Sequence, residues 1–366
     1  QYKVPNGMSY NSYVILDDKI AVMDTVDGFF TEEWLNNVEQ VLDGKMPDYL
    51  VIQHMEPDHS ASIPAFLKKY PKVTVVSTAK GFQFMEQFFP EFFAEQGLPA
   101  EQRIVAANDG ILELGQHSLH FVYAPMVHWP EVMMTYEATE KILFAADGFG
   151  KFGALDVEEE WANEARRYYI GIVGKYGPQV QAVLKKAAGL DIQTICSLHG
   201  PVLKENLGFY LEKYDKWSSY QPEESGVVIA YASVYGNTRS AAEYLADVLQ
   251  EKGQKTVLYD LARCDKAKAV ADAFRYDRLV LAGITYNGDL FPCMRSFIEG
   301  LTERNYQNRK VAIIENGTWA PMAGKLILGM FEKSKNLTFT ETTVSIKSAM
   351  NEQNKGEIGK LAEELC

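Results

Sequence analysis

The chain has 366 residues, of which 47% are hydrophobic, and carries a net charge of −13 with a pI near 5.1. This length exceeds one ordinary hydrophobic core and predicts two domains. The acidic balance argues against nucleic acid and anionic membranes as partners, because both select basic surfaces, and no apolar run of about 18 residues predicts a membrane span. The four cysteines are scattered without a Cys-x-x-Cys pair, which favours a reducing cytoplasm and argues against a built-in rubredoxin module.

The first half of the chain mixes short apolar strands with amphipathic helices. A helix is predicted from Thr31, and another begins within residues 60–64, where a serine would cap it and a proline follows early. The phenylalanines of residues 82–93 have helical spacing and predict a packing face. The predicted strands are residues 13–16, 20–24, 49–53, 73–76, 115–125, 141–146 and 194–198.

A metal-capable cluster follows the third of these strands. His54, Glu56, Asp58 and His59 fall within six residues, at a strand-to-helix corner where several side chains can point at one spot. The alternative is a solvated acidic loop with two chance histidines. Because the chain has only six histidines in total, metal binding is the favoured interpretation.

Three further metal-capable residues, His128, Asp147 and His199, each come directly beyond a predicted strand. Taken singly, each fits a local hydrogen-bonding role as well as a ligand role. Together with the cluster they form an ordered series of ligand types at four strand ends. His117 and His120 lie three apart on a strand and therefore on opposite faces, which favours surface or structural roles for them.

The ligand order resembles the metallo-β-lactamase fold, in which two β-sheets flanked by helices hold a binuclear metal site. Hydrolases of that fold open with His-x-His-x-Asp-His, and here Glu56 stands where the second histidine would be. An added carboxylate stabilises the higher oxidation state of a redox metal, whereas zinc has no oxidation state to stabilise. With this glutamate, and with the stretches 128–130 and 197–201, the chain is similar to the flavodiiron proteins, also called A-type flavoproteins.

By this resemblance, the two iron ions would share seven ligands, with Asp147 bridging. One ion would be held by His54, Glu56, His128 and Asp147, and the other by Asp58, His59 and His199. Trp129 follows ligand His128, and two roles for it stay open: contact with the flavin of a partner subunit, or core packing.

A polar, proline-containing linker spans residues 218–226 and predicts a domain boundary there, with domains at residues 1–220 and 226–366. Beyond it, strands and helices alternate, which predicts a doubly wound parallel sheet. No Gly-x-Gly-x-x-Gly follows the first strand and no P-loop is present, so dinucleotide and nucleoside triphosphate sites are not predicted. The predicted strands are residues 227–231, 256–259, 279–282, 311–314 and 342–344.

Three loops at the ends of these strands resemble the FMN-binding loops of flavodoxins. Hydroxyl, amide and backbone N–H groups at a helix start suit a phosphate monoester without lysine. The alternative is a flavin-free domain or an ordinary helix cap. The phosphate loop would be Ser233, Val234, Tyr235, Gly236, Asn237 and Thr238, and the loops around the isoalloxazine would be Thr285, Tyr286, Asn287 and Gly288, and Asn316, Gly317, Thr318 and Trp319.

The sequence therefore predicts an α/β chain: an N-terminal metallo-β-lactamase-like αβ/βα sandwich followed by a flavodoxin-like doubly wound five-stranded parallel sheet. The resemblance implies a cytoplasmic oxidoreductase that uses two iron ions and FMN to reduce O2 to water or NO to N2O. It also implies a head-to-tail homodimer, with pairing of dimers into tetramers left open, and an outside electron donor, either rubredoxin or a reduced deazaflavin.

Two other functions are weighed against this one. A binuclear zinc hydrolase with a flavodoxin-like assembly domain is disfavoured by Glu56 and by the intact loop at residues 233–238. An electron carrier with a vestigial metal site is disfavoured because all seven ligand positions are filled. The choice between O2 and NO stays open, since both reactions use the same ligands.

Overall fold

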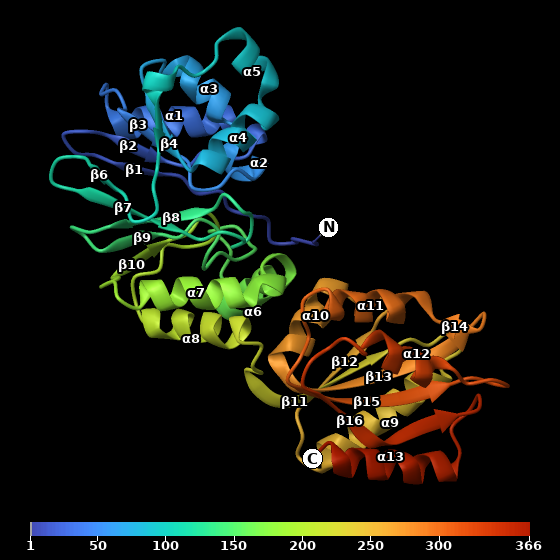
Figure 1. Ribbon diagram of the computed structural model, residues 1–366. Helices are drawn as coiled ribbons and strands as arrows, with labels where there is room; N and C mark the ends of the chain where they lie inside the picture. The colour runs from blue at the N-terminus through green and yellow to red at the C-terminus, as the bar shows by residue number, and fades with distance from the viewer. Residues whose placement is uncertain (1) are drawn as a thin grey trace. The chain divides into compact units, whose positions relative to one another are not determined.

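The computed structural model describes residues 2–366 (Figure 1). The chain divides into two compact units. The N-terminal unit comprises Val4–Tyr168 and Pro178–Tyr214, and the C-terminal unit comprises Tyr169–Gly177, Asp215–Cys366 and residues 2 and 3. Over residues 2–366, no helix has both the length and the apolar character needed to cross a membrane.

The N-terminal unit contains two five-stranded sheets. In the first sheet β1 is antiparallel to β2 and the remaining pairs are parallel; in the second, β6 to β9 are antiparallel and β10 is parallel to β9. The first sheet consists of β1 (Tyr13–Ile15), β2 (Ala21–Met23), β3 (Tyr49–Val51), β4 (Thr74–Ser77) and β5 (Arg103–Val105). The second consists of β6 (Ile111–Glu113), β7 (Ser118–Tyr123), β8 (Met133–Glu137), β9 (Ile142–Phe144) and β10 (Thr194–Cys196).

Helices cover the outer faces of both sheets (Figure 1). Those beside the first sheet are α1 (Thr31–Leu42), α2 (Pro57–Ser60), α3 (Ile63–Lys69), α4 (Ala79–Phe88) and α5 (Pro90–Glu95), with the short 3-10 helices η1 (Gly28–Phe30) and η2 (Ala100–Gln102). Those beside the second are α6 (Trp161–Ile172), α7 (Gly177–Ala187) and α8 (Leu207–Ser218). The short η3 (Gly174–Tyr176), which lies between α6 and α7 in sequence, belongs to the C-terminal unit. This arrangement is the predicted αβ/βα sandwich.

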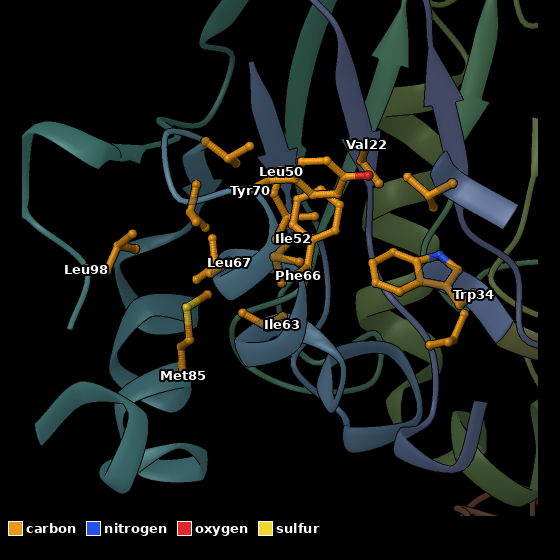
Figure 2. Close-up of a cluster of buried hydrophobic side chains, with 14 of the residues drawn as sticks. Val22, Trp34, Leu50, Ile52, Ile63, Phe66, Leu67, Tyr70, Met85 and Leu98 are labelled. Carbon is orange, nitrogen blue, oxygen red and sulfur yellow. The ribbon is translucent and has the colours of Figure 1, made fainter. Parts of the chain in front are cut away.

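Successive residues of the first sheet enter two different cores, as the period of two in a strand requires. Val22 and Leu50 pack beneath the helices against Trp34 and Phe66, whose ring centroids are 5.5 Å apart (Figure 2). Their neighbour Met23 belongs instead to the core between the two sheets. Both faces of the first sheet are therefore buried, which explains why its strands are almost continuously apolar.

A serine, Ser62, stands at the predicted cap position of the helix after the metal-capable cluster, but its side chain does not cap the helix. Helix α3 begins at Ile63 with Pro64 in its first turn, as expected, but Ser62 makes no side-chain cap bond. The Ser62 hydroxyl donates instead to the carbonyl of Val26 at 3.0 Å, and Ser60 is the last residue of the short helix α2. These hydroxyls tie the corner to neighbouring chain rather than cap a helix.

The C-terminal unit has a parallel sheet in the order β12-β11-β13-β15-β16, with the short β14 antiparallel to β13. This is the flavodoxin-like strand order, so the predicted fold class is confirmed. The strands are β11 (Glu224–Tyr231), β12 (Thr256–Asp260), β13 (Tyr276–Tyr286), β14 (Asp289–Leu290), β15 (Arg309–Asn316) and β16 (Leu337–Ile346). In Figure 1, α9 (Asn237–Glu251) and α13 (Glu352–Glu364) lie on one face, and α10 (Lys266–Arg275), α11 (Pro292–Thr302) and α12 (Ala323–Met330) on the other.

The predicted linker is shorter than expected, because residues 224–226 already belong to strand β11. Residues 169–177 belong to the C-terminal unit although they precede the linker in sequence. The domain boundary between residues 220 and 226 stays a prediction.

A partly buried ion pair joins the turns of the two sheets of the N-terminal unit. Asp17, in the β1–β2 turn, accepts hydrogen bonds from the backbone N–H of His117 at 2.7 Å and from its Nδ1 at 2.8 Å. The Asp17 side chain is only 3% exposed. Burial alone would lower the pKa of His117, but the hydrogen bond and charge of Asp17 outweigh it and raise that pKa. His117, which directly precedes β7, thus has a structural role, one of the two roles favoured for it by the sequence.

We predict that His117→Gln destabilises the protein in a pH-dependent way. A raised folded-state pKa means that the charged imidazole contributes stability below its unfolded pKa of about 6.5, and that this contribution fades as the pH rises through the folded value. The difference in unfolding free energy between wild type and variant is therefore larger at about pH 5.5 than at about pH 9. Urea unfolding followed by circular dichroism measures it.

The matched control is His120→Gln, since the His120 ring meets the Ser118 hydroxyl at 3.2 Å instead of a carboxylate. An equal loss of stability at both pH values for His117→Gln would contradict the ion-pair assignment.

Candidate metal centre and cofactor pocket

The cluster at residues 54–59 lies where β3 ends, and the end of β2 holds it in place. The buried carboxylate of Asp24 accepts hydrogen bonds from the backbone N–H of Gln53 at 2.7 Å and from its side-chain amide at 2.9 Å. Burial raises the pKa of Asp24 to about 6, against the lowering effect of these hydrogen bonds. The Thr25 hydroxyl donates to the carbonyl of His59 at 2.7 Å. Two residues after β2 therefore fix both ends of the corner.

The seven residues predicted as ligands come together in two groups, in each of which the candidate ligand atoms all lie within 4.8 Å of one another. The first group is His54, Glu56, His128 and Asp147, and the second group is Asp58, His59 and His199. Asp58 and His59 lie in the short helix α2, and the others come from the loops after β3, β7, β9 and β10. Because β7, β9 and β10 run in the same direction, their carboxyl ends meet at one edge of the second sheet, facing the corner after β3.

Asp147 faces both groups with a different oxygen. Its Oδ2 lies 3.1 Å from Nε2 of His128 and 3.4 Å from Nε2 of His54, in the first group. Its Oδ1 lies 3.0 Å from Nε2 of His59 and 3.6 Å from Nε2 of His199, in the second group. One carboxylate thus reaches both groups, which is the geometry of a ligand shared between two cations.

The remaining carboxylates each serve one group. Glu56 Oε2 lies 2.9 Å from Nε2 of His128 and 3.3 Å from Nε2 of His54. Asp58 Oδ2 lies 3.3 Å from Nε2 of His199 and 3.5 Å from that of His59. Two ligands held at right angles about 2.1 Å from one metal ion are about 3 Å apart, so these nitrogen–oxygen distances suit neighbouring ligands of one ion.

Several of these buried atoms lack hydrogen bonds, although they are close together. Within the described residues, no hydrogen-bond partner is found for Nδ1 or Nε2 of His59, for Oδ1 of Asp58, or for Oδ1 of Asp147. Buried polar atoms are nearly always paired, so Nε2 of His59 and Oδ1 of Asp147, which lie 3.0 Å apart and both lack a hydrogen-bond partner among residues 2–366, indicate a site for a cation that both would bind. The residues present therefore fit a pair of metal ions.

The charges of the cluster are strongly coupled. Burial alone would lower the pKa of His128, but hydrogen bonds to Asp147 and Glu56 outweigh it and raise that pKa to about 9. Burial alone would raise the pKa of Glu56, and hydrogen bonds with His128 and His54 lower it to about 2. Carboxylates this crowded demand positive charge, which metal ions supply when they displace the imidazole protons.

The structure also places the neighbours of the cluster. Trp129 lies edge-on to the His54 ring at a centroid distance of 5.3 Å and stacks on Phe88 at 6.2 Å, so it packs within its own subunit. Its contact with a partner's flavin stays a prediction. Asp24, Thr25 and Glu131 were not predicted to matter; the only sequence signal for Asp24 and Thr25 is a polar pair directly after the wholly apolar strand β2.

Besides the metal cluster of the N-terminal unit, the C-terminal unit has a cavity of about 560 Å³ at the carboxyl ends of β11, β13 and β15. This size is within the range of small-molecule and cofactor sites. Predicted residues that line it are Ser233, Val234, Tyr235, Asn237, Thr238, Thr285, Tyr286, Asn287, Gly288, Asn316, Gly317, Thr318 and Trp319. Residues that line it without having been predicted are Ile284, Ala320, Met322 and Ser348. Gly236 does not line the cavity; it adopts a φ of +91° at the start of α9.

The lining of this cavity suits a phosphorylated, flat, aromatic molecule. It contains no lysine or arginine, so an anion would be held by hydroxyl groups and by backbone N–H groups at the start of the 15-residue helix α9. Tyr235 and Trp319 are 92% and 90% exposed, respectively, and they leave large apolar rings uncovered beside it. The residues present therefore fit the predicted flavin mononucleotide.

Two predicted cofactor residues also hold the cavity together. The Thr285 hydroxyl accepts hydrogen bonds from the backbone N–H of Met322 at 2.8 Å and of Ala323 at 3.1 Å, and so caps helix α12. The buried Asn316 amide donates to the carbonyl of Ser348 at 2.8 Å and to the Thr238 hydroxyl at 3.3 Å. Asn316 thereby ties a fourth loop, after β16, to the phosphate loop.

Comparison with known proteins agrees with this architecture. Residues 8–200 match the family model described as ODP family beta lactamase, and residues 228–337 match that of a flavodoxin domain. The chain belongs to the ODP beta lactamase family. The predicted resemblance of this ODP family chain to the A-type flavoproteins is confirmed by both domain matches and by a relative from Synechocystis sp., diflavin flavoprotein A 1, which is 33% identical over 273 residues.

That alignment covers 72% of this chain and 46% of the Synechocystis protein, so the chain spans about half of that relative's length. The anaerobic nitric oxide reductase flavorubredoxin of Vibrio vulnificus is 28% identical over 87% of this chain and 65% of its own length. Among solved structures, the rubredoxin oxygen:oxidoreductase of Desulfovibrio gigas matches with a TM-score of 0.90 at 24% identity, covering 99% of this chain and 91% of that one. The last similarity establishes the fold of this ODP family member.

We predict that removing divalent metal ions lowers the unfolding temperature of the N-terminal unit and that adding Fe(II) back restores it. Each group takes ligands from both sheets, so bound ions cross-link them. An ion at about 100 times its dissociation constant stabilises the folded state by about 2.7 kcal/mol. Calorimetry with and without a chelator measures the shift.

Asp147→Asn is the matched variant for this experiment, because it removes the charge shared by both groups and keeps the side-chain shape. We expect its unfolding temperature to depend much less on metal than that of the wild type. A wild-type protein that unfolds at the same temperature with and without metal would contradict the assignment of the two groups.

Proposed function

We propose that this protein is an oxidoreductase that reduces O2 to water, NO to N2O, or both, with two iron ions, FMN and electrons from an outside donor. The observation that carries the proposal is the position of Asp147. Its Oδ2 faces the first ligand group and its Oδ1 faces the second. A shared carboxylate sets two metal ions side by side, as the joint reduction of a diatomic molecule requires. The names of the Vibrio and Desulfovibrio proteins support the two alternative substrates.

The donor set supports iron over zinc. The two groups contain four imidazoles and three carboxylates and no thiolate, and Glu56 brings an oxygen donor into the first group. Catalytic zinc sites also use histidine and carboxylate ligands, so the residue that favours iron is Glu56, because an added carboxylate stabilises the higher oxidation state of a redox metal and zinc has none to stabilise. Iron and FMN, when bound, supply the electron storage and transfer that the reaction needs.

The protein's own contribution is to hold the ligands and to leave one side open. The side chains of His54, His59, His199 and Asp147 are at most 2% exposed. Those of Glu56 and Asp58 are 35% and 26% exposed. A small gas molecule would therefore reach the centre from the side of these two carboxylates, while the buried histidines fix the ligand geometry from behind.

Partners and location follow as further parts of the proposal. The exposed aromatic rings beside the cofactor cavity offer a surface for a second copy of the chain in a head-to-tail homodimer. The name of the Desulfovibrio relative supports rubredoxin as the electron donor, and a reduced deazaflavin is the alternative. All four cysteines are free thiols, which supports a reducing compartment such as the cytoplasm.

We expect Glu56→Ala to abolish gas reduction while FMN stays bound, because the variant loses the carboxylate that faces both His54 and His128 of the first group. Turnover is measured anaerobically with chemically reduced rubredoxin, once with O2 and once with NO, and the flavin absorption of the same sample reports FMN. Turnover equal to that of the wild type would reject the assignment. Zinc in the purified protein without flavin absorption would favour a binuclear hydrolase instead.

We expect Asn316→Ala to weaken FMN binding without changing the iron content. The variant loses the amide that joins the Ser348 loop to Thr238. Asn316 makes three side-chain hydrogen bonds, since its Oδ1 also accepts from the backbone N–H of Ser348, and each is worth about 1 kcal/mol. FMN binding has to re-order the loops that they release, and if about half of this cost falls on binding, FMN affinity drops by roughly 10-fold. Titration of the flavin-depleted protein with FMN measures the change, and Asn336→Ala, an exposed amide bonded to Asn308, is the control. Identical FMN affinities for Asn316→Ala and wild type would show that the bridge does not shape the cavity.

A further inference from the structure

A buried glutamate outside the seven candidate ligands contacts the corner that carries them. Glu131 lies in the loop between β7 and β8 and is 3% exposed. Its Oε1 accepts a hydrogen bond from Nδ1 of His54 at 2.7 Å and another from the backbone N–H of Met55 at 2.9 Å. Because a carboxylate oxygen accepts, the ring proton that meets Glu131 sits on Nδ1, and Nε2, which faces Glu56 and Asp147, is the nitrogen placed to bind a metal ion.

The Nδ1 atoms of the cluster histidines differ in their hydrogen-bond partners. His54 meets a carboxylate through Nδ1, whereas Nδ1 of His199 donates to the neutral backbone carbonyl of Ser9 at 2.7 Å. Nδ1 of His59 is buried, and no hydrogen-bond partner is found for it in the described chain. A carboxylate behind the imidazole makes the ring a stronger metal ligand than a carbonyl does, because it stabilises positive charge on the ring and the metal.

The hydrogen bonds that hold the β7–β8 loop do not require a charged side chain at Glu131. Both of its hydrogen bonds go to Oε1, and Oε2 is buried without a hydrogen-bond partner among the described residues. A glutamine could accept the same two bonds through its carbonyl oxygen and would bury no charge. A buried carboxylate with an idle oxygen is costly unless a positive charge lies nearby, and the first ligand group is where that charge would be.

We propose that Glu131 is a positioning residue that orients His54 and supplies negative charge to the first group, so that this group binds its metal ion more tightly than the second and fills first. The inference rests on the proposed function, since the ion concerned is iron. Each group has one carboxylate of its own, Glu56 in the first and Asp58 in the second, and Asp147 faces both. Glu131 adds a further negative charge to the first group alone.

The test compares Glu131→Gln, which keeps the hydrogen bonds and removes the charge, with Glu131→Ala, which removes both. The matched control is Glu137→Gln. Glu137 is 1% exposed and accepts hydrogen bonds from the backbone N–H groups of Thr139 and Glu140 at 2.8 and 2.7 Å, at the far end of β8. It therefore reports the effect of removing a buried carboxylate charge outside the metal cluster.

The full chain with FMN bound is stripped of metal and equilibrated anaerobically with chelator-buffered Fe(II) over a graded series of free concentrations. Iron per chain is measured by elemental analysis, and flavin absorption checks that FMN is retained. We expect two binding steps in the wild type. In Glu131→Gln the tighter step weakens by about 10- to 100-fold while the weaker step and the flavin are unchanged, and in Glu131→Ala the tighter step weakens further. Glu137→Gln behaves as wild type.

Wild-type iron binding in Glu131→Gln would overturn the proposal, and so would weakening of both steps to the same degree in Glu131→Gln and Glu137→Gln. If the wild-type protein bound both iron ions in a single step, the proposal that the first group fills before the second would be overturned. If Glu131→Ala fails to fold, Glu131→Gln alone still decides. A wild type that takes up no iron would count against the proposed function instead.

Discussion

The N-terminal unit is organised around a cluster of carboxylates whose negative charge is balanced either by protonated imidazoles or by metal ions. Asp147 lies at the centre, with an imidazole nitrogen 3.0 Å from one of its oxygens and another 3.1 Å from the second. Three further carboxylates contact the histidines around it: those of Glu56, Asp58 and Glu131. Buried carboxylates are tolerated only when cations or hydrogen-bond donors surround them. This edge of the sandwich therefore fits a binding site for two metal ions.

Both sites use the same property of parallel strands. The carboxyl ends of neighbouring parallel strands meet at one edge of a sheet, and the loops there can carry polar side chains without disturbing the core. In the N-terminal unit the strands β3, β9 and β10 supply ligands in this way, and in the C-terminal unit β11, β13 and β15 supply the walls of the cofactor cavity. In each site a buried polar residue holds the loops from behind: Glu131 in the first, Asn316 in the second.

The sequence predicted the features that are formed by neighbouring residues and missed the contacts between residues far apart in the chain. The cluster at residues 54–59 is visible because its ligand types are close in sequence, and the alternation of strands and helices after residue 226 reveals a doubly wound sheet. Glu131 lies 77 positions from His54, and nothing in its own neighbourhood marks it as a partner of that ring. Ser348 reaches the cofactor cavity only because β16 is the neighbour of β15. The sequence placed a serine at the cap of α3 but missed, for the same reason, that the Ser62 hydroxyl donates to Val26 across the fold instead of capping the helix.

The distribution of ligands over the two sheets links the metal centre to the fold. In the first group, His54 and Glu56 follow a strand of the first sheet, while His128 and Asp147 follow strands of the second; the other group is divided in the same way. The core between the sheets consists of apolar side chains, which attract without fixing a single alignment, whereas metal–ligand bonds tolerate only small displacements. Bound ions would therefore set the alignment of the sheet edges. Since the histidines are enclosed from behind, the two partly exposed carboxylates remain as the side from which a substrate can approach.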